Sequence, residues 1–184
     1  MDHFIQTYFA NLESKDKNIQ YEAYQNILAV TEKEVDWAYE VWDQLLEDLH
    51  HQDHHKRSRA AQFLSYLAIS DPDKRILNDF PELWEVTKDE KFVTARHSLQ
   101  SIWRVGLAGT EQREMVLHHL VERFNNCLPE KNHTLIRFDI IQGLRHLYDA
   151  MINAEEIKQI AIDLVSKEEN EKYQKKYKTI WKDA

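Results

Sequence analysis

A chain of 184 residues is long enough for one domain with a sizeable hydrophobic core. Hydrophobic residues make up 42% and charged residues 30%, which excludes a disordered chain, and 3 Gly with 3 Pro are too few for the turns of an all-β or α/β protein. The net charge of −8 disfavours non-specific nucleic-acid binding by the whole surface but allows a local basic patch.

Apolar residues at helical spacing predict a first helix over about residues 2–12 and a second through residues 19–30. We expect the third helix to begin at Thr31, because Thr31 and Glu34 fit the S/T-x-x-E capping box. Its apolar positions run from Val35 to about residue 49 on one face. The chain thus begins with three amphipathic helices joined by short polar segments.

Asp53 predicts the start of a fourth helix over 54–70, and Asp71-Pro72 that of a fifth, since both fit helix start signals. Pro81 is expected to kink or divide the fifth helix. Gly109 is well placed to end the sixth helix, 91–108, in the left-handed conformation. The remaining helix starts are predicted at Asp89 (sixth), Thr110 (seventh), Asn132 (eighth), Asn153 or Ala154 (ninth) and about Asn170 (tenth).

The second helix of each pair begins at a polar capping residue, and these residues recur along the chain. Asp16, Asp53, Asp89 and Asn132 are separated by 37, 36 and 43 residues. A period of this length built from helix pairs is typical of α-solenoids, in which stacked copies cover one another's apolar faces. A non-repetitive helical bundle with accidental spacing is the alternative.

The best copy, DHHKRSRAAQFLSYLA from Asp53 to Ala68, resembles the inner helix of a HEAT repeat. The copies that begin at Asp89 and Asn132 match in part, with Arg96 and Arg137 near the place that Arg59 takes, in an imperfect register. The resemblance spans almost the whole chain and implies architecture alone. The predicted fold is therefore all-α: a short right-handed HEAT-like α-solenoid of about ten helices in five antiparallel pairs, forming one domain over 1–184.

Basic residues gather on the second helices of the pairs, whereas the third helix of the chain is strongly acidic. The resemblance implies that the second helices line the concave face, which would make that face a basic groove on an acidic protein. Such a groove would suit an acidic protein segment or a nucleic-acid backbone. Alternatively, the bases are solvated or pair with acids on adjacent helices. The candidate binding residues are Lys56, Arg57, Arg59, Arg96, Arg104, Arg137 and Arg145.

The sequence shows no strong motif for a catalytic site, a cofactor site or a metal site. Cys127, the only cysteine, reads as a small buried hydrophobe rather than a catalytic thiol. The histidines of residues 50–55 are consecutive at a helix boundary, so we expect no metal there. A DNA alkylation-repair groove would use an aromatic residue, a base and an acid, a role that Trp103, Arg104 and Asp139 could fill.

These observations favour a non-enzymatic interaction module without a cofactor that binds a protein partner through a basic concave face. The alternative is a nucleic-acid-binding or DNA alkylation-repair-like protein that uses the same groove. A third interpretation is assembly with another chain through an apolar end such as the first helix. The N-terminal stretch lacks a basic segment and a continuous apolar run, so we expect no signal peptide, no membrane partner and a cytoplasmic protein.

Overall fold

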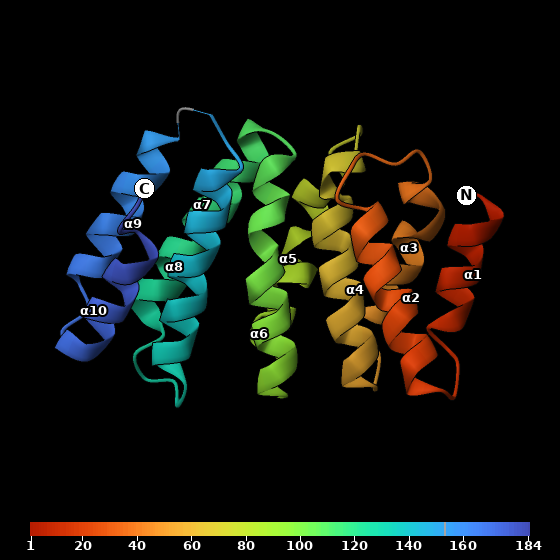
Figure 1. Ribbon diagram of the computed structural model, residues 1–184, viewed down its shortest axis with the longest axis horizontal. Coiled ribbons are helices and arrows are strands. Elements are labelled where there is room, and N and C mark those ends of the chain that lie inside the picture. The colour runs from red at the N-terminus through yellow and green to blue at the C-terminus, as the bar shows by residue number, and fades with distance from the viewer. Residues whose placement is uncertain (153) are drawn as a thin grey trace.

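The computed structural model describes residues 1–152 and 154–184 and is all-helical, with no strand among those residues (Figure 1). In the same part of the chain, no helix is long and apolar enough to cross a lipid bilayer. The helices are α1 (His3–Asn11), α2 (Lys17–Val30), α3 (Ala38–Asp48), α4 (His54–Leu67), α5 (Ile76–Val86), α6 (Phe92–Ser101), α7 (Thr110–Asn126), α8 (His133–Asp149), α9 (Glu155–Ser166) and α10 (Glu171–Ile180), with two short 3₁₀ helices, η1 (Ala68–Ser70) and η2 (Ile102–Leu107).

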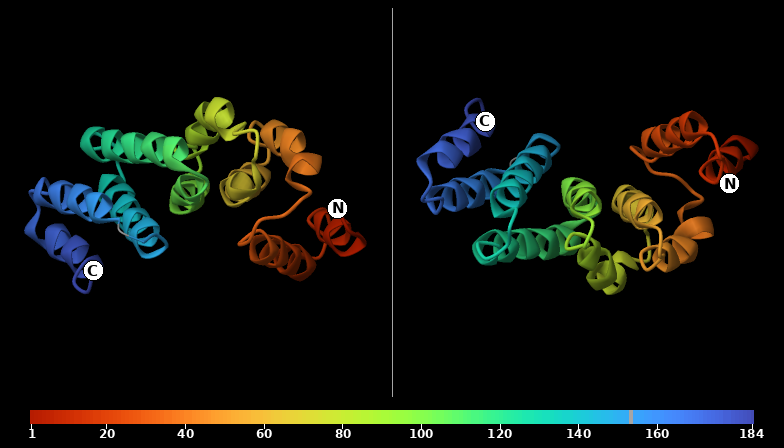
Figure 2. Two further views of the ribbon diagram at one scale, coloured as in Figure 1. Left: turned by 90° about the horizontal axis from the view of Figure 1, so that it is seen from above. Right: turned by 90° about the horizontal axis from the view of Figure 1, so that it is seen from below.

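The helices follow one another in chain order from one end of the molecule to the other (Figure 1). Seen along the helices, α3, α5 and α7 form one row and α2, α4, α6 and α8 form a second (Figure 2). Close backbone contacts join α2 to α4, α4 to α6, and α6 to α8 within the second row. The second row continues through α10, which contacts α8. Because α2 and α10 lie farther from the first row than α4 and α6 do, this line of helices is curved, and its concave side faces away from α3, α5 and α7 (Figure 2).

One continuous cluster of buried apolar side chains runs between the rows, from Ile5 to Tyr177. Its largest fully buried members include Trp42, Phe63 and Phe124. Each helix therefore buries an apolar stripe against its neighbours, which stabilises helices too short to be stable alone.

Several predicted helix starts are confirmed, because capping by Asp or Asn depends on local geometry. The side chains of Asp16, Asp53 and Asn170 accept hydrogen bonds from backbone amides in the first turns of α2, α4 and α10. Asp89 accepts one from the amide of Lys91, just before α6. Asn132 precedes α8 as predicted, but its side chain makes no capping bond.

Other predicted boundaries are wrong. Thr31 ends α2 rather than starting α3, since its hydroxyl donates back to the carbonyl of Ile27 at 2.8 Å. Gly109 precedes α7 in an extended conformation, while α6 ends earlier and continues as η2. Pro81 lies inside a single helix, α5, so the predicted division into two helices is wrong, and α5 starts at Ile76 rather than next to Pro72.

The carboxylate of Asp71 nevertheless caps the start of α5, by accepting hydrogen bonds from the amides of Arg75 and Ile76 at 3.0 and 2.8 Å. Of the two predicted starts of the ninth helix, Asn153 lies outside the described residues. Ala154 immediately precedes α9.

Candidate binding groove

The candidate basic residues fall into two groups, according to whether a carboxylate neutralises them. Arg57 belongs to the neutralised group: its Nε and Nη2 donate to the carboxylate of Asp89 at 2.6 and 2.9 Å. The Asp89 side chain is only 5% exposed. Burial acts to raise the pKa of Asp89, but the hydrogen bonds from Arg57 and from the Lys91 amide outweigh it and hold that pKa below its usual range. The pair joins α4 to the segment that begins α6.

The same arrangement recurs along the second row. Arg96 on α6 donates through Nε and Nη2 to Asp139 on α8, at 2.7 and 2.8 Å. Arg137 on α8 donates to Glu168, beyond α9, at 2.8 Å, and both of these side chains are buried. These three arginines therefore tie consecutive pairs of helices together, and their charge is not free for a ligand.

Two more candidates are also paired with carboxylates. Lys56 lies 3.0 Å from the carboxylate of Glu13, at the start of the chain. Arg145 donates to Asp149 one turn along α8 at 2.8 Å and to the carbonyl of Ile180 at 2.8 Å. The pairing of bases with acids on adjacent elements thus accounts for most of the basic strip.

Arg59 and Arg104 differ from these five. Among the described residues, no carboxylate lies within 4.0 Å of Arg59, and its single hydrogen bond is a long one of 3.4 Å to the carbonyl of Leu12. Arg104 meets the exposed carboxylate of Glu32 at 3.5 Å, while its guanidinium lies flat over Tyr66, 3.6 Å from the ring centroid. An exposed contact of this length contributes little, so the cation of Arg104 remains available on an aromatic ring.

Both arginines line adjoining hollows on the curved side of the second row. One hollow, of about 400 Å³, lies over α2, α4 and the start of α6. The other, of about 410 Å³, lies over α2, α4, α6, η2 and α8. They share Tyr24, Gln62 and His97, so they form one continuous surface, which we call the inner groove.

The inner groove is rich in aromatic side chains. The hydroxyl of Tyr24 donates to Gln62 at 2.6 Å, which fixes the tyrosine ring across α2 and α4. Trp103 lies beside the imidazole of His146, with ring centroids 5.4 Å apart. Tyrosine, tryptophan and arginine are the residues most often enriched at the energetic centres of protein interfaces.

The histidines of the inner groove carry little positive charge at neutral pH. Burial lowers the pKa of His97, and the neighbouring Arg96 lowers it further. Burial also lowers the pKa of His146; the charge of Asp149 acts to raise that pKa, and the charge of Arg104 acts to lower it. Because the ordinary pKa of histidine is about 6.5, both imidazoles are neutral at pH 7. Arg59, Arg104 and Lys17 are therefore the lysine and arginine side chains that line the inner groove.

The histidine cluster is more compact than the sequence suggests. One ligand atom each from Asp53, His54 and His55 lies within 4.8 Å of the others. The carboxylate of Asp53, however, already caps α4 by accepting the His55 amide at 2.8 Å. The positive end of the helix dipole points at the same place and opposes a cation there.

The residues considered for DNA alkylation repair do not form one site. Trp103 and Arg104 line the inner groove, but the carboxylate of Asp139 is buried and accepts hydrogen bonds from Arg96 and Gln100. Cys127 is buried too, and burial raises the pKa of its thiol. Neither the acid nor the thiol is therefore presented to a substrate.

Sequence reasoning missed Tyr24 and Tyr66, because on α2 and α4 they resemble the edge of an apolar stripe. A usable signal existed for two of the paired arginines, because each is followed by an acid some tens of residues later: Asp89 comes 32 residues after Arg57, and Asp139 comes 43 residues after Arg96. Comparison with models of known protein families finds no match for the chain, and comparison with curated proteins finds none either.

Proposed function

We propose that the chain is a HEAT-like α-solenoid, a single domain of five antiparallel helix pairs, that binds a protein partner in the inner groove without catalysing a reaction. The solenoid assignment is supported by the contacts of α2, α4, α6 and α8 with one another and by the regular Arg–Asp links between them. Under this assignment, the curved second row is the concave face. Concave faces of helical repeats are extended binding surfaces.

The observation that carries the proposal is the presence, in one groove, of half-buried aromatic rings beside two arginines that have no close, buried carboxylate partner. Tyr24, Tyr66 and Trp103 supply apolar area at low entropic cost, and Arg59 and Arg104 supply charge. An acidic segment with apolar or aromatic side chains complements both features. We therefore propose an acidic protein segment as the partner.

The same observations disfavour a nucleic-acid backbone as the ligand. A protein that follows phosphates needs several free cations, because affinity comes from the release of counterions at each contact. Five of the seven candidate bases are held by carboxylates at 3.0 Å or less. The inner groove therefore offers too few cations for a long phosphate track.

The test begins with acidic peptides selected from a display library against the wild-type protein, with affinities measured by fluorescence polarisation. The double variant Tyr66→Ala and Arg104→Ala should weaken binding at least tenfold, since it removes an aromatic anchor and its cation. Arg113→Ala on α7, outside the inner groove, is the matched control and should leave affinity unchanged.

Equal affinity of the groove variant and the wild type would refute the proposal. Submicromolar binding of duplex DNA with a steep dependence on salt would favour the nucleic-acid interpretation instead.

A further inference from the structure

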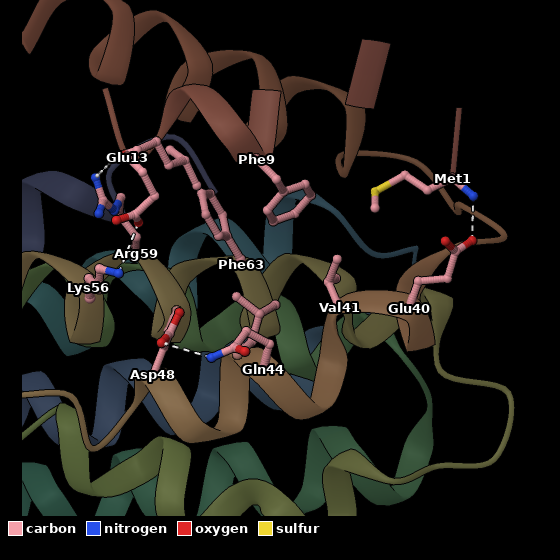
Figure 3. Close-up of a pocket in the computed structure, with 13 residues that line it drawn as sticks. Met1, Phe9, Glu13, Glu40, Val41, Gln44, Asp48, Lys56, Arg59 and Phe63 are labelled. Carbon is pink, nitrogen blue, oxygen red and sulfur yellow. Dashed lines mark hydrogen bonds and ion pairs between the residues drawn. The ribbon is translucent and has the colours of Figure 1, made fainter. Parts of the chain in front are cut away.

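A second hollow, which shares Arg59 with the inner groove, lies at the N-terminal end of the molecule between α1, α3 and α4 (Figure 3). Its volume is about 530 Å³, within the range of small-molecule sites. Phe9 of α1, Val41 and Leu45 of α3, and Phe63 of α4 provide its apolar walls. We call it the N-terminal hollow.

The N-terminal hollow exists because the regular stacking of helices is interrupted at α1. Elsewhere the first helices of successive pairs touch: α3 contacts α5, α5 contacts α7, and α7 contacts α9. In the described part of the chain, the extensive backbone contacts of α1 are with α2 alone. The space that an α1–α3 contact would fill is left open.

Side chains hold the walls of the N-terminal hollow apart at fixed positions. The ring of Phe9 meets Trp37 and Phe63 edge-on, with centroids 5.9 and 6.0 Å away. The N-terminal amine of the chain pairs with Glu40 at one end (Figure 3). These contacts make the hollow a formed feature rather than a gap between unconnected helices.

Most charges that line the N-terminal hollow are neutralised within the protein. Glu40 is paired with the N-terminal amine, and Glu13 lies 3.0 Å from Lys56. Asp48 accepts a hydrogen bond from Gln44 at 3.3 Å. Arg59 stands next to Lys56 at the other end of the hollow, with only the long bond to a backbone carbonyl described above (Figure 3). Asp48 and Arg59 are therefore the lining charges without an ion-pair partner among the described residues, and the unpaired cation is the guanidinium at one end of the apolar pocket.

We propose that the N-terminal hollow binds an amphipathic carboxylate: an unbranched apolar chain along Phe9, Val41 and Phe63, with its carboxylate on Arg59. Guanidinium and carboxylate form charge-assisted, two-pronged hydrogen bonds, which fit a half-buried arginine with free donors. Arg59 lines the inner groove as well, but the apolar walls made by Phe9, Val41 and Phe63 belong to the N-terminal hollow and not to the inner groove. The proposal therefore does not depend on the function of the inner groove.

The test measures binding of hexanoate, octanoate and decanoate to the full chain by isothermal titration calorimetry. Affinity should rise about fourfold for each added methylene, as expected for transfer of a methylene group out of water. Arg59→Gln should weaken decanoate binding about tenfold, which is the effect of losing a hydrogen bond to a charged group. Val41→Phe should abolish binding by filling the space.

Matched controls separate the site from general effects. Arg104→Gln removes a cation of the inner groove and should leave decanoate affinity unchanged. Thermal unfolding of each variant shows whether it is folded, and Arg59→Gln, a half-exposed position, tests the site even if Val41→Phe fails to fold. Decylammonium should bind more weakly than decanoate.

The proposal is overturned if decanoate gives no saturable heat with the wild type or if affinity does not depend on chain length. Equal decanoate binding by Arg59→Gln, or decylammonium binding as tight as that of decanoate, would also overturn it.

Discussion

The link between α6 and α8 allows a quantitative prediction for the variant Asp139→Ala. The Asp139 side chain is 2% exposed and accepts three hydrogen bonds, two from Arg96 and one from Gln100 at 3.0 Å. Removing one partner of a fully buried ion pair costs about 3–5 kcal/mol. The Arg96 side chain is 30% exposed, so water solvates its guanidinium once the carboxylate is removed. We therefore expect the free energy of unfolding to fall by about 2–3 kcal/mol.

The assay is urea denaturation followed by circular dichroism, with thermal unfolding in parallel. In a domain of this size, the expected loss lowers Tm by about 5–10 °C. Asp149→Ala on the same helix is the control, since its side chain is 49% exposed and pairs with Arg145 one turn away. That pair should contribute less than about 0.5 kcal/mol.

A double-mutant cycle with Arg96→Met should give a coupling energy above about 1 kcal/mol for the Arg96–Asp139 pair. If Asp139→Ala costs no more than Asp149→Ala, or the coupling energy is near zero, the pair does not join the two helices energetically and the reasoning fails.

Three further predictions follow from buried groups. The pKa of Asp89 is lower in the folded protein than in the unfolded chain, where it is about 3.9, so its charge stabilises the fold above that pH and this stabilisation is lost as pH falls through the folded pKa. The difference in unfolding free energy between the wild type and Asp89→Asn, measured by urea denaturation, should therefore narrow below about pH 4. A difference that stays constant with pH would contradict the lowered pKa of Asp89. Tyr177→Phe should cost about 1 kcal/mol, because the hydroxyl donates to a backbone carbonyl of α8 at 2.8 Å, whereas Tyr173→Phe should change the unfolding free energy little. Cys127 should react with a thiol reagent at least tenfold more slowly in the native protein than in urea, since the thiol is buried and burial raises its pKa; equal rates would place it at the surface.

The sequence was a good guide to helices and a poor guide to some of their ends. Asp53 and Asn170 cap helices as predicted, because that signal lies within three residues. Thr31 and Glu34 matched a capping box equally well, yet the Thr31 hydroxyl bonds to the preceding turn instead. Threonine competes for backbone carbonyls in this way, and the choice depends on packing that a local motif does not contain.

Pro81 shows the same limit for helix interiors. Its missing amide removes one hydrogen bond from α5, which argued for a break. The neighbouring Phe80 and Leu83 are fully buried, and Trp84 nearly so. The burial of these apolar side chains on α5 outweighs the lost hydrogen bond. The pattern of polar and apolar residues in the sequence does not predict how deeply a helix face will be buried.

For the candidate site, the sequence predicted which helical segments carry the basic residues. It did not predict that most of those residues are paired with carboxylates. Helical periodicity gives the face on which Arg96 or Arg137 lies, whereas their partners Asp139 and Glu168 are 43 and 31 residues away. The distance between such residues depends on how helices stack. The N-terminal hollow was unpredictable for the same reason, since it results from a contact that α1 does not make with α3.

The ion pairs that join neighbouring helices differ in how deeply they are buried along the chain. Local unfolding should therefore require less free energy in some helices than in others. In the α-solenoid that we propose, each helix pair is held by its own stability and by coupling to its neighbours. The links of Arg57, Arg96 and Arg137 use carboxylates that are at most 6% exposed, whereas the ion pairs at the N-terminal end of the molecule use the exposed carboxylates of Glu13 and Glu40.

Amide hydrogens of α1 and α2 should therefore exchange with deuterium through local opening at a lower free energy than those of α4, α6 and α8. A ligand that fills the N-terminal hollow would strengthen the coupling of α1 and α2 to the neighbouring helices. It would raise the opening free energy of the first helix pair toward that of the rest of the chain.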